Sequence, residues 1–509
     1  MLSVKGERIR GVALNYLSLI ARNLIGILII PFIVSNVGTS SYGVYALVGS
    51  IVGYLVIIEL GLANTAVRFI SKYKSTRDYY NLSKFLGHCI VLYSGCILVA
   101  NVLAYFMYLN IDNYFVNSLN NNEIELFKEM FIILVVNISL TLAGNTITGI
   151  IVAEEKFVYL KVLDLSMLII RTIFIVLGFN YFNIDIVGVV FIDTGLNAIA
   201  IIFRYVYVVK KIPIRPIFSG DSKLLKEVLI YGFFISLNVI VNQVNWRLDS
   251  FIIGSNLSSE AVAVFSVGLQ FVLAFIAVGS AATNIFLPKM VKLVENNSGV
   301  KALSEEMNRI GRFQIVILSI VLINYSLTGN YIISFLFGPE FDMAFYTSLV
   351  VMIPFSFVLA MSVSNCILQA MNKHAFKSCL LFILAPINVL ISIFMIESFG
   401  IIGAPLGTAI CLVFGELFLM GIYLGKNIQL SLQDLWLSFL KISCLAIGFY
   451  FSYSIIGLEI SGWSKLILHS FAITSSFFIV LWLFFFNSNE KKFIGGLFLK
   501  FFWKKYSTV

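Results

Sequence analysis

The sequence is poor in the residues that soluble folds and disordered chains require. Only 12% of its 509 residues are charged, whereas a soluble globular domain carries about 25%. Hydrophobic residues make up 60% of the chain and the mean hydropathy is +0.97, which excludes a soluble protein. There are only eight prolines and no low-complexity stretch rich in Gly, Ser or acidic residues. Disorder is therefore excluded except in the last few residues.

The residues that build metal centres, disulfide frameworks and catalytic sites are also scarce. The six cysteines all lie in apolar runs, and the three histidines are far apart. No Cys-x-x-Cys pair or Cys/His cluster is present, which argues against both zinc and disulfides. The sequence has no Walker loop, so ATP is not the direct source of energy. No long outer loop carries paired carboxylates, which disfavours a membrane glycosyltransferase or polysaccharide polymerase, and we expect that the chain is not an enzyme.

What the chain has instead is long apolar runs. A membrane-spanning helix needs about 20 apolar residues. Runs of this kind lie near residues 11–34, 42–67, 85–108, 127–151, 158–178, 184–208, 228–254, 261–287, 313–337, 343–370, 376–396, 399–424, 436–457 and 465–486. The first run is too long for a signal peptide and contains Arg22. The sequence therefore predicts an all-α integral membrane protein with fourteen transmembrane helices.

Basic residues are distributed unevenly between the two sides of these spans. If the N-terminus is cytoplasmic, 30 of the 35 Lys and Arg residues fall in inner loops or in the termini. Of the other five, Lys128 and Lys465 lie outside, and Arg22, Arg171 and Arg247 lie within spans. Lys and Arg mark the cytoplasmic side of a membrane protein, so we expect both termini there. The net charge of +9 then reflects orientation, and we expect no nucleic-acid partner.

The chain also matches itself at an offset of 220 residues. The aligned stretches include 35-SNVGTSSYGVY-45 and 255-SNLSSEAVAVF-265, and further on Lys72 aligns with Lys292. The offset places the first span on the seventh and the sixth on the twelfth. Each repeat has six spans, and an even number of spans returns the chain to the side where it began. Both repeats therefore enter the membrane from the same side and are parallel. The alternative is a duplicated scaffold without transport.

The repeat predicts a division of the chain into four parts. We expect an N-terminal lobe at 1–208, a cytoplasmic linker at 209–227, a C-terminal lobe at 228–424, and two extra helices with a basic cytoplasmic tail at 425–509. Two similar six-helix lobes are typical of a transporter that rocks between two states.

Several motifs in the N-terminal third occur together. Pro31 lies near the outer end of the first span, a Gly-x-x-x-Tyr-Gly-x-Tyr turn runs from Gly38 to Tyr45, and a Glu-Leu-Gly-Leu step begins at Glu59. These motifs resemble the polysaccharide-transporter branch of the MOP flippase superfamily, which often has Asp in place of Glu59. The stretches 369-QAMNKHAFK-377 and 403-GAPLGTA-409 also resemble that family.

The resemblance implies a MATE-like fold and a Wzx-type flippase. Such a carrier moves an undecaprenyl-diphosphate-linked oligosaccharide, the repeat unit of an O-antigen or similar surface polysaccharide, from the cytoplasmic to the periplasmic leaflet. It implies a bacterial inner membrane, contact with membrane lipid, and a polysaccharide polymerase and chain-length regulator as partners. The alternative within the superfamily is a MATE-like, ion-coupled drug or cation antiporter.

A flippase needs a polar cavity for the anionic headgroup, and the spans contain charged candidates. An ionisable residue inside a bilayer must face protein or water, and guanidinium binds phosphate bidentately. Arg22, Arg247 and Arg171 are therefore candidates for the diphosphate, and the repeat directs Arg22 and Arg247 toward one cavity. Arginines in both repeats favour an anionic substrate over a cation. For Arg247 the alternative is a structural ion pair.

Acidic and neutral residues complete the predicted cavity. Five acids lie in spans and can couple transport to H⁺ or Na⁺, with Asp249 the first choice before Asp164, Glu59, Asp193 and Glu416. The alternative is that they balance the charge of the arginines. Neutral cavity candidates are Asn15, Asn242, Gln243, Asn145, Asn365 and Gln369. Interhelical hydrogen bonding is the alternative for these residues. No cofactor other than a coupling ion is expected.

Overall fold

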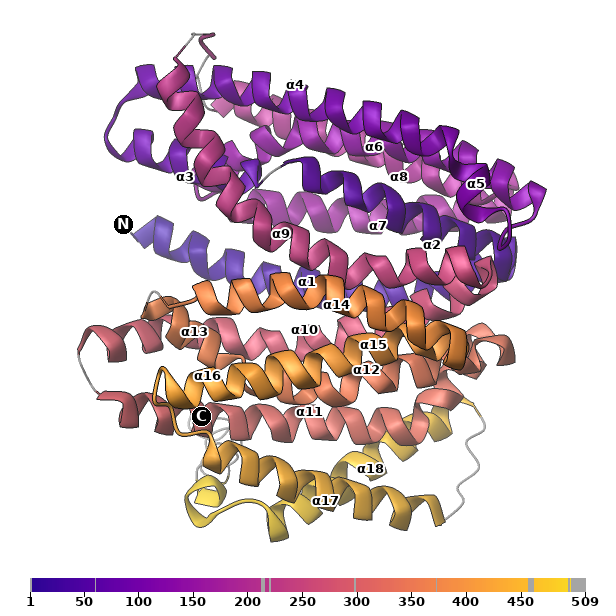
Figure 1. Cartoon of the computed structure of the whole chain (residues 1–509), viewed down its shortest axis with the longest axis vertical. Helices are drawn as coiled ribbons and strands as arrows, with labels where there is room; N and C mark the ends of the chain where they lie inside the picture. Colours follow the sequence, from indigo (N-terminus) through magenta and orange to yellow (C-terminus); the bar gives the residue numbers. More distant parts are fainter. Residues whose placement is uncertain are drawn as a thin grey trace, which may run out of the picture. The chain divides into compact units, whose positions relative to one another are not determined.

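The computed structural model describes residues 2–59, 61–211, 216–218, 221–296, 299–371, 373–455, 462–492 and 495. Within these ranges, the side chains of residues 2–13, 233–235, 237–242, 244–246, 281–282, 284–285 and 287–288 are outside the description. The described part of the chain is helical and contains no strand, as the sequence predicts (Figure 1).

The chain forms two compact units. Unit 1 comprises Met1–Leu273, Tyr346–Ser348 and Phe376–Cys411, and unit 2 comprises Ala274–Phe345, Leu349–Ala375 and Leu412–Val509. Unit 1 thus includes a segment from the second repeat as well as the whole first repeat. The division into lobes at residues 208 and 228 remains a prediction.

Unit 1 contains the helices of the first repeat and five elements from later in the chain. They are α1 (Leu2–Val37), α2 (Thr39–Tyr54), η1 (Leu55–Glu59), α3 (Leu62–Ser75), α4 (Tyr79–Leu109), α5 (Ile111–Phe115), α6 (Asn121–Ala153), α7 (Phe157–Phe182), α8 (Ile186–Lys211), α9 (Ser222–Asn256), the first part of α10 (Ser259–Glu295), α14 (Ala375–Phe399), η3 (Gly400–Ile402) and α15 (Gly403–Cys411). Helix α6 packs along α8, and α1 packs along α7.

Unit 2 is built around α11. Its elements are the rest of α10, α11 (Gly299–Phe337), η2 (Pro339–Phe341), most of α12 (Asp342–Ala360), α13 (Val363–Ala370), the π-helical η4 (Leu412–Leu419), α16 (Met420–Lys426), α17 (Gln433–Ile455) and α18 (Trp463–Phe484). A core of buried side chains forms where α11, α17 and α18 meet, with Ile315, Ile442 and Phe477 among its members. This core holds α17 and α18 against α11.

Twelve helical segments in the described residues are long and apolar enough to cross a membrane. One of them, Ala375–Lys426, is 52 residues long and joins two of the expected spans. At 1.5 Å per residue it measures about 78 Å, more than twice the hydrocarbon thickness of a bilayer. The chain is therefore a multi-pass membrane protein, while the count of fourteen spans remains a prediction.

The second expected span is a broken helix. Helix α2 tightens into the 3-10 helix η1, and Gly61 then takes a left-handed conformation with φ of 66° before α3 begins. A β-carbon is disfavoured at this φ, which explains the glycine in the Glu-Leu-Gly-Leu step. Breaks of this kind in a membrane helix require other groups to satisfy the freed polar atoms.

The helix bounds reproduce the offset seen in the sequence. Helices α2 and α4 begin at residues 39 and 79, and α10 and α11 begin at 259 and 299, which is 220 residues later in both cases. The aligned Asn36 and Asn256 even make the same bond, because each donates to the carbonyl four residues earlier. The internal repeat is thus visible in local structure as well as in sequence.

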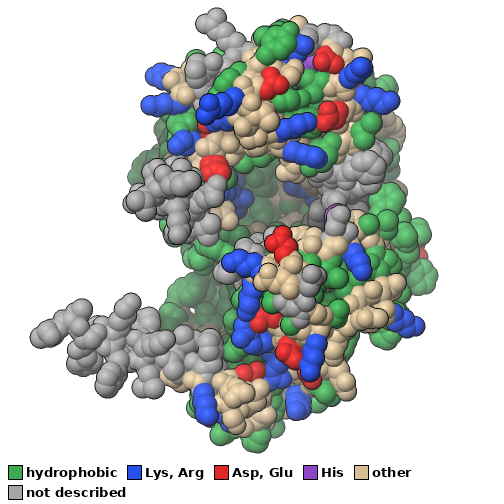
Figure 2. All heavy atoms as spheres, turned by 90° about the vertical axis from the view of Figure 1, so that its left-hand side faces the viewer, with side chains coloured by type: hydrophobic (Ala, Val, Ile, Leu, Met, Phe, Trp, Pro, Cys, Tyr) green, Lys and Arg blue, Asp and Glu red, His purple; other side chains and the backbone are tan. Residues whose placement is uncertain are grey.

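Basic side chains gather where several helices end. The last turns of α3, α8, α10 and α16 contain Lys72 and Lys74, Lys210 and Lys211, Lys292, and Lys426 respectively. Figure 2 shows Lys and Arg side chains on the surface of unit 1 and, taken by itself, on that of unit 2. Cations stabilise helix C-termini and mark the cytoplasmic side of a membrane protein. We therefore expect the C-terminal ends of α3, α8, α10 and α16 to face the cytoplasm.

Candidate functional site

A charged cavity lies in unit 1 between α1, α6, α7 and α8. Its volume is about 540 Å³. The polar residues that line it are Ser18 and Arg22 from α1, Asn137 and Thr141 from α6, Asp164 and Arg171 from α7, and Asp193, Asn197 and Arg204 from α8. The structure thus brings together four candidates that are far apart in the sequence: Arg22, Arg171, Asp164 and Asp193.

Arg171 and Asp193 form a two-pronged ion pair in the wall of this cavity. The Nε of Arg171 donates to Oδ1 of Asp193 over 2.5 Å, and Nη2 donates to Oδ2 over 2.9 Å. The hydroxyl of Tyr45 donates to the same carboxylate over 3.2 Å. Bidentate geometry of this kind gives the strongest ion pairs in proteins. Asp193 therefore neutralises Arg171, which is the charge-balancing alternative for this acid.

Arg204 and Asp164 form a second pair. Nη2 of Arg204 lies 2.9 Å from Oδ1 of Asp164, and Nη1 lies 3.3 Å from the hydroxyl of Thr148. The buried Nε of Arg204 has no hydrogen-bond partner among the described residues. Arg204 lies near the end of the expected span at 184–208 and is not among the cavity residues that the sequence predicts. Its spacing was the available signal, because Asp193, Asn197 and Arg204 share one face of a helix.

Neutral side chains tie α6 to α8 along the same cavity. Asn197 donates to Oδ1 of Asn137 over 2.8 Å and to the hydroxyl of Thr141 over 2.7 Å. Asn137 donates to Thr194 over 3.1 Å. This part of the polar stripe on α6 therefore makes interhelical hydrogen bonds, which is the common use of such residues in membranes.

Arg22 differs from the other two arginines because it has no carboxylate partner among the described residues. Its side chain is exposed where it lines the cavity, and the neighbouring hydroxyl of Ser18 is buried without a hydrogen-bond partner in the described structure. Three arginines face two aspartates here, and both aspartates are paired. The cavity wall therefore carries one uncompensated positive charge, which suits an anion.

A second cluster in unit 1 surrounds Asp249 with oxygen atoms. The buried carboxylate accepts hydrogen bonds from Thr408 over 3.0 Å and from Ser392 over 3.4 Å. The hydroxyl of Ser392 also lies 3.3 Å from Oδ1 of Asn388 and 3.2 Å from the carbonyl of Ala404. Asp249 has no basic partner in the described residues. Carboxylate, hydroxyl and carbonyl oxygens are the ligands of hard cations, and the same carboxylate can hold a proton.

Two glycines bring α14 and α15 close enough to build this cluster. A β-carbon on Gly407 would lie 2.4 Å from the hydroxyl oxygen of Ser392, and one on Gly403 would lie 2.4 Å from the backbone of Met395. These glycines belong to the 403-GAPLGTA-409 stretch and have the small-xxx-small spacing of closely packed membrane helices. The motif therefore acts by setting Thr408 beside Ser392 and Asp249.

Arg247 makes hydrogen bonds within α9 and to α2. Its Nε donates to Gln243 over 2.7 Å and its Nη1 donates to the carbonyl of Gly49 over 3.0 Å. Gly53 leaves room for the guanidinium, since a β-carbon there would lie 2.3 Å from Nη1. Arg247 is not among the described residues that line the cavity containing Arg22. A role of Arg247 and Gln243 in ligand binding remains a prediction.

Glu59 and Asn145 meet at the break in the second expected span. One carboxylate oxygen of the buried Glu59 accepts from Tyr93 over 2.7 Å and from Asn145 over 3.0 Å. These bonds satisfy the acid beside the broken helix, as expected for a structural role.

Five candidates remain: Asn15, Asn365, Gln369, Glu416 and Asn242. Asn15 is exposed on α1 and does not line the cavity. Asn365 and Gln369 lie on α13, and Glu416 lies on η4, all in unit 2. The side chain of Asn242 lies outside the described residues.

The fold and these clusters define a multi-pass, all-helical membrane protein with a charged cavity within a helical repeat. Comparison with known structures gives the same class. The lipid II flippase MurJ in an inward closed conformation matches with a TM-score of 0.69 at 16% identity, covering 95% of this chain and 99% of that chain. An inward-facing MATE family multidrug transporter of the MOP superfamily matches with a TM-score of 0.63 at 14% identity, covering 80% of this chain and 97% of that chain. The chain thus has the MOP-superfamily fold.

Comparison of the sequence with known proteins identifies the family within this class. A model of the family described as "Polysaccharide biosynthesis protein" matches residues 9–294, which is more than half of the chain, and the protein belongs to this family. A Shigella flexneri protein that is named provisionally as an O-antigen transporter is 22% identical over 407 residues, covering 79% of this chain and 94% of that protein. These relatives are described as transporters or flippases, in agreement with the expectation that the chain is not an enzyme.

Proposed function

We propose that the protein is a flippase for an undecaprenyl-diphosphate-linked oligosaccharide, the repeat unit of an O-antigen or similar surface polysaccharide. It moves this lipid from the cytoplasmic to the periplasmic leaflet of the bacterial inner membrane by alternating access. The family and the provisional O-antigen transporter among its relatives support a substrate of polysaccharide biosynthesis. A polysaccharide polymerase and a chain-length regulator are the partners that such a substrate would require.

The unpaired Arg22 is the observation that carries this proposal. A diphosphate is anionic and needs a cationic group that is not already neutralised by the protein. Arg171 and Arg204 are held by aspartates, whereas Arg22 lines the cavity without one in the described structure. Hydroxyl and amide groups on α6 and α8 lie beside it and can bind sugar hydroxyls. A cation antiporter would be expected to have an excess of acids in this place.

Transport of a fluorescent undecaprenyl-diphosphate oligosaccharide in reconstituted vesicles tests the proposal. Removing a charge-assisted hydrogen bond costs roughly 1.5–3 kcal/mol, or about ten- to a hundredfold in binding. We therefore expect Arg22→Ala to lower the flipping rate at limiting substrate by about this factor, and Arg22→Lys to retain part of the activity. Transport by Arg22→Ala at the wild-type rate would contradict the proposal.

We also propose that Asp249 couples transport to an ion gradient. The support is a buried carboxylate with hydroxyl neighbours and no basic partner among the described residues. Such a group can release H⁺ or Na⁺ on one side of the membrane and take it up on the other. Asp249→Asn keeps the shape and removes the charge, so its transport rate should ignore imposed pH and Na⁺ gradients to which the wild type responds.

The variant Thr408→Val distinguishes coupling to Na⁺ from coupling to H⁺. This change keeps the side-chain volume and removes one oxygen from the cluster, so a Na⁺ response should weaken while a H⁺ response should persist. If the wild-type protein ignores both gradients, coupling through Asp249 is wrong and the protein is a passive flippase. That outcome would leave the substrate proposal intact, because it is tested by Arg22.

The proposed topology has fourteen spans with both termini in the cytoplasm. It is supported by the distribution of Lys and Arg and by their concentration at one set of helix ends. A reporter that is active only in the cytoplasm, fused after Val509, should be active. Activity of a periplasm-specific reporter at the same position would contradict this topology.

A further inference from the structure

A second charged cavity lies in unit 2, between α11, α17 and the segment that follows α18. Its volume is about 970 Å³. Three basic and three acidic residues of the described structure line its wall. The basic residues are Arg309, Arg312 and Lys441, and the acidic residues are Glu305, Asp434 and Glu490. Apolar residues including Phe313, Ile317 and Leu437 complete the lining. The proposed flippase function does not use this cavity.

Helices α11 and α17 run side by side in parallel along it. Near their starts, Ser431 donates its backbone N–H to Ser304 over 3.0 Å, and Asn308 donates to the carbonyl of Ser431 over 3.0 Å. Further along, Arg312 donates to Ser438 over 2.5 Å. Because the residue numbers rise together in these pairs, equivalent turns of the two helices lie at similar depth.

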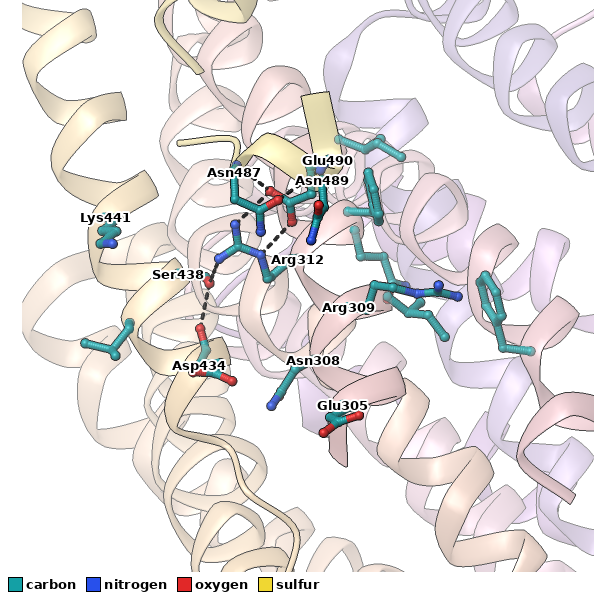
Figure 3. A pocket seen from close by; sticks show the side chains of 16 residues that line it. Glu305, Asn308, Arg309, Arg312, Asp434, Ser438, Lys441, Asn487, Asn489 and Glu490 are labelled. Carbon is teal, nitrogen blue, oxygen red and sulfur yellow. Dashed lines mark hydrogen bonds and ion pairs between the residues drawn. The ribbon is translucent and has the colours of Figure 1, made fainter. Parts of the chain in front are cut away.

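The parallel arrangement sorts the charges by depth. On each helix an acid is followed seven residues later by a base, from Glu305 to Arg312 and from Asp434 to Lys441. Seven residues correspond to about 10 Å along a helix axis. Figure 3 shows Glu305, Asn308 and Asp434 near one end of the cavity, and Arg312 and Lys441 toward the other. The acidic end lies at the helix starts, which is the membrane-surface end.

Arg312 is already neutralised within the wall. Its Nε and Nη2 donate to the two carboxylate oxygens of Glu490 over 2.8 and 3.0 Å, and its guanidinium lies 4.7 Å from the ring centre of Phe485. Arg309 donates to Glu306, outside the lining. Glu305, Asp434 and Lys441 form no ion pair in the described part of the chain. One base at depth and two acids nearer the surface therefore remain for a ligand.

Two buried carboxamides line the cavity with unsatisfied acceptor atoms. Asn308 is 5% exposed and Gln314 is 2% exposed. Both use their N–H groups, Asn308 toward Ser431 and Gln314 toward the carbonyl of Gly279, yet neither Oδ1 of Asn308 nor Oε1 of Gln314 has a hydrogen-bond partner in the described structure. A buried acceptor without a donor costs about 1–3 kcal/mol. These two acceptors favour a ligand that donates hydrogen bonds over one that only accepts them.

We propose that this cavity binds the headgroup of a zwitterionic aminophospholipid of the phosphoethanolamine class. The primary ammonium donates to Oδ1 of Asn308 and pairs with Glu305 and Asp434, while the deeper phosphate pairs with Lys441. The acyl chains lie against Phe313 and Ile317. The order of amine, phosphate and acyl chain from the surface inward matches the order of acids, base and apolar residues. Within the described residues, the unpaired Lys441, together with the unpaired Glu305 and Asp434, favours a zwitterion over an anionic lipid.

Native mass spectrometry of the purified full chain tests the proposal. The probes are phosphatidylethanolamine, phosphatidylcholine and phosphatidylglycerol with identical acyl chains. Phosphatidylcholine has no N–H donor, and phosphatidylglycerol has no cation. Because a hydrogen bond to a charged group contributes roughly 1.5–3 kcal/mol, we expect phosphatidylethanolamine to bind about tenfold more tightly than either of the others. Equal binding of the three lipids, or preference for phosphatidylglycerol, would overturn the proposal.

Variants locate the site. Glu305→Gln with Asp434→Asn should reduce the preference for phosphatidylethanolamine by about tenfold. The matched control is Glu125→Gln with Glu129→Gln, which removes two exposed acids from α6 in unit 1 and should leave the preference unchanged. Persistence of the full preference in the first variant, or its loss in the control, would contradict the assignment. The lipid comparison on the wild-type chain remains decisive if a variant does not fold, and neither result bears on glycolipid flipping.

Discussion

The charged cavities of the two units contain the same types of residue and differ in how these residues are paired. In unit 1, Asp164 and Asp193 hold two arginines, and Arg22 is left without a carboxylate in the described structure. In unit 2 the bases and acids are equal in number, and Arg312 is held by Glu490. The comparison teaches that the ligand charge a membrane cavity accepts depends on the charges that its own wall leaves unpaired.

The largest expected loss of stability comes from breaking a pair in unit 1. Asp193→Asn removes the carboxylate that accepts two bonds from Arg171 and one from Tyr45. A buried charge without its partner destabilises a protein by roughly 3–5 kcal/mol. We expect about 3 kcal/mol here, measured as a lower midpoint of unfolding for the purified protein. The double variant Asp193→Asn, Arg171→Met should recover much of the loss; a larger loss in the double variant would contradict the pairing.

The equivalent change in unit 2 is Glu490→Gln. It leaves Arg312 beside Ser438 and Phe485 without its bidentate partner. Arg312 keeps its hydrogen bond to Ser438 and its contact with the ring of Phe485, which partly compensate for the lost partner, so we expect a smaller loss of about 2 kcal/mol. It should also make the second cavity positive and raise binding of phosphatidylglycerol relative to phosphatidylethanolamine. Glu295→Gln, an exposed acid outside the cavity, is the control; an unchanged lipid preference in Glu490→Gln would show that Arg312 does not face the ligand.

Low pH should gradually remove the contribution of the Arg312–Glu490 ion pair to the stability of the protein. Burial alone would raise the pKa of Glu490, but the hydrogen bonds from Arg312 and the backbone of Asn487 outweigh it and hold the pKa below its usual value of 4.5. A carboxyl with a lowered pKa in the folded state stabilises the protein above its unfolded pKa and loses this effect as the pH falls through the folded pKa. The difference in unfolding midpoint between wild type and Glu490→Gln should be constant from pH 7 to about 4.5 and shrink below. A constant difference down to pH 2 would contradict the lowered pKa.

The smallest effect on stability is expected for Arg22→Ala. Arg22 has no ion pair to lose among the described residues, so the free energy of unfolding should change by about 0.5 kcal/mol or less. The same variant should lose most transport, as proposed above. Measured together, the transport rate and the free energy of unfolding would distinguish a ligand-binding arginine from the structural arginines Arg171, Arg204 and Arg312. A large loss of stability in Arg22→Ala would show that it has a structural partner after all.

Much of this arrangement could be predicted from the sequence, and the limits are informative. The apolar runs at 158–178 and 184–208 predict α7 and α8 as spans. Arg171, Asp164 and Asp193 are predicted cavity residues because charges inside a membrane require a polar environment. Their pairing was not predictable, because it depends on which faces of α7 and α8 meet. Arg204 lies near the end of its span, where composition alone cannot distinguish a snorkelling residue from a cavity residue.

By itself, the sequence determined that the chain is an all-helical, multi-pass membrane protein with an internal repeat and a resemblance to polysaccharide transporters. These properties depend on the length of apolar runs and the spacing of motifs along the chain. Only the tertiary structure decided that Asp249 meets Thr408 and Ser392 through the close approach permitted by Gly403 and Gly407, and that Arg22 keeps its charge unpaired within the described residues. The physical reason is that hydrogen bonds and ion pairs act over about 3 Å between side chains, and helix packing alone brings residues from distant parts of the chain within that range.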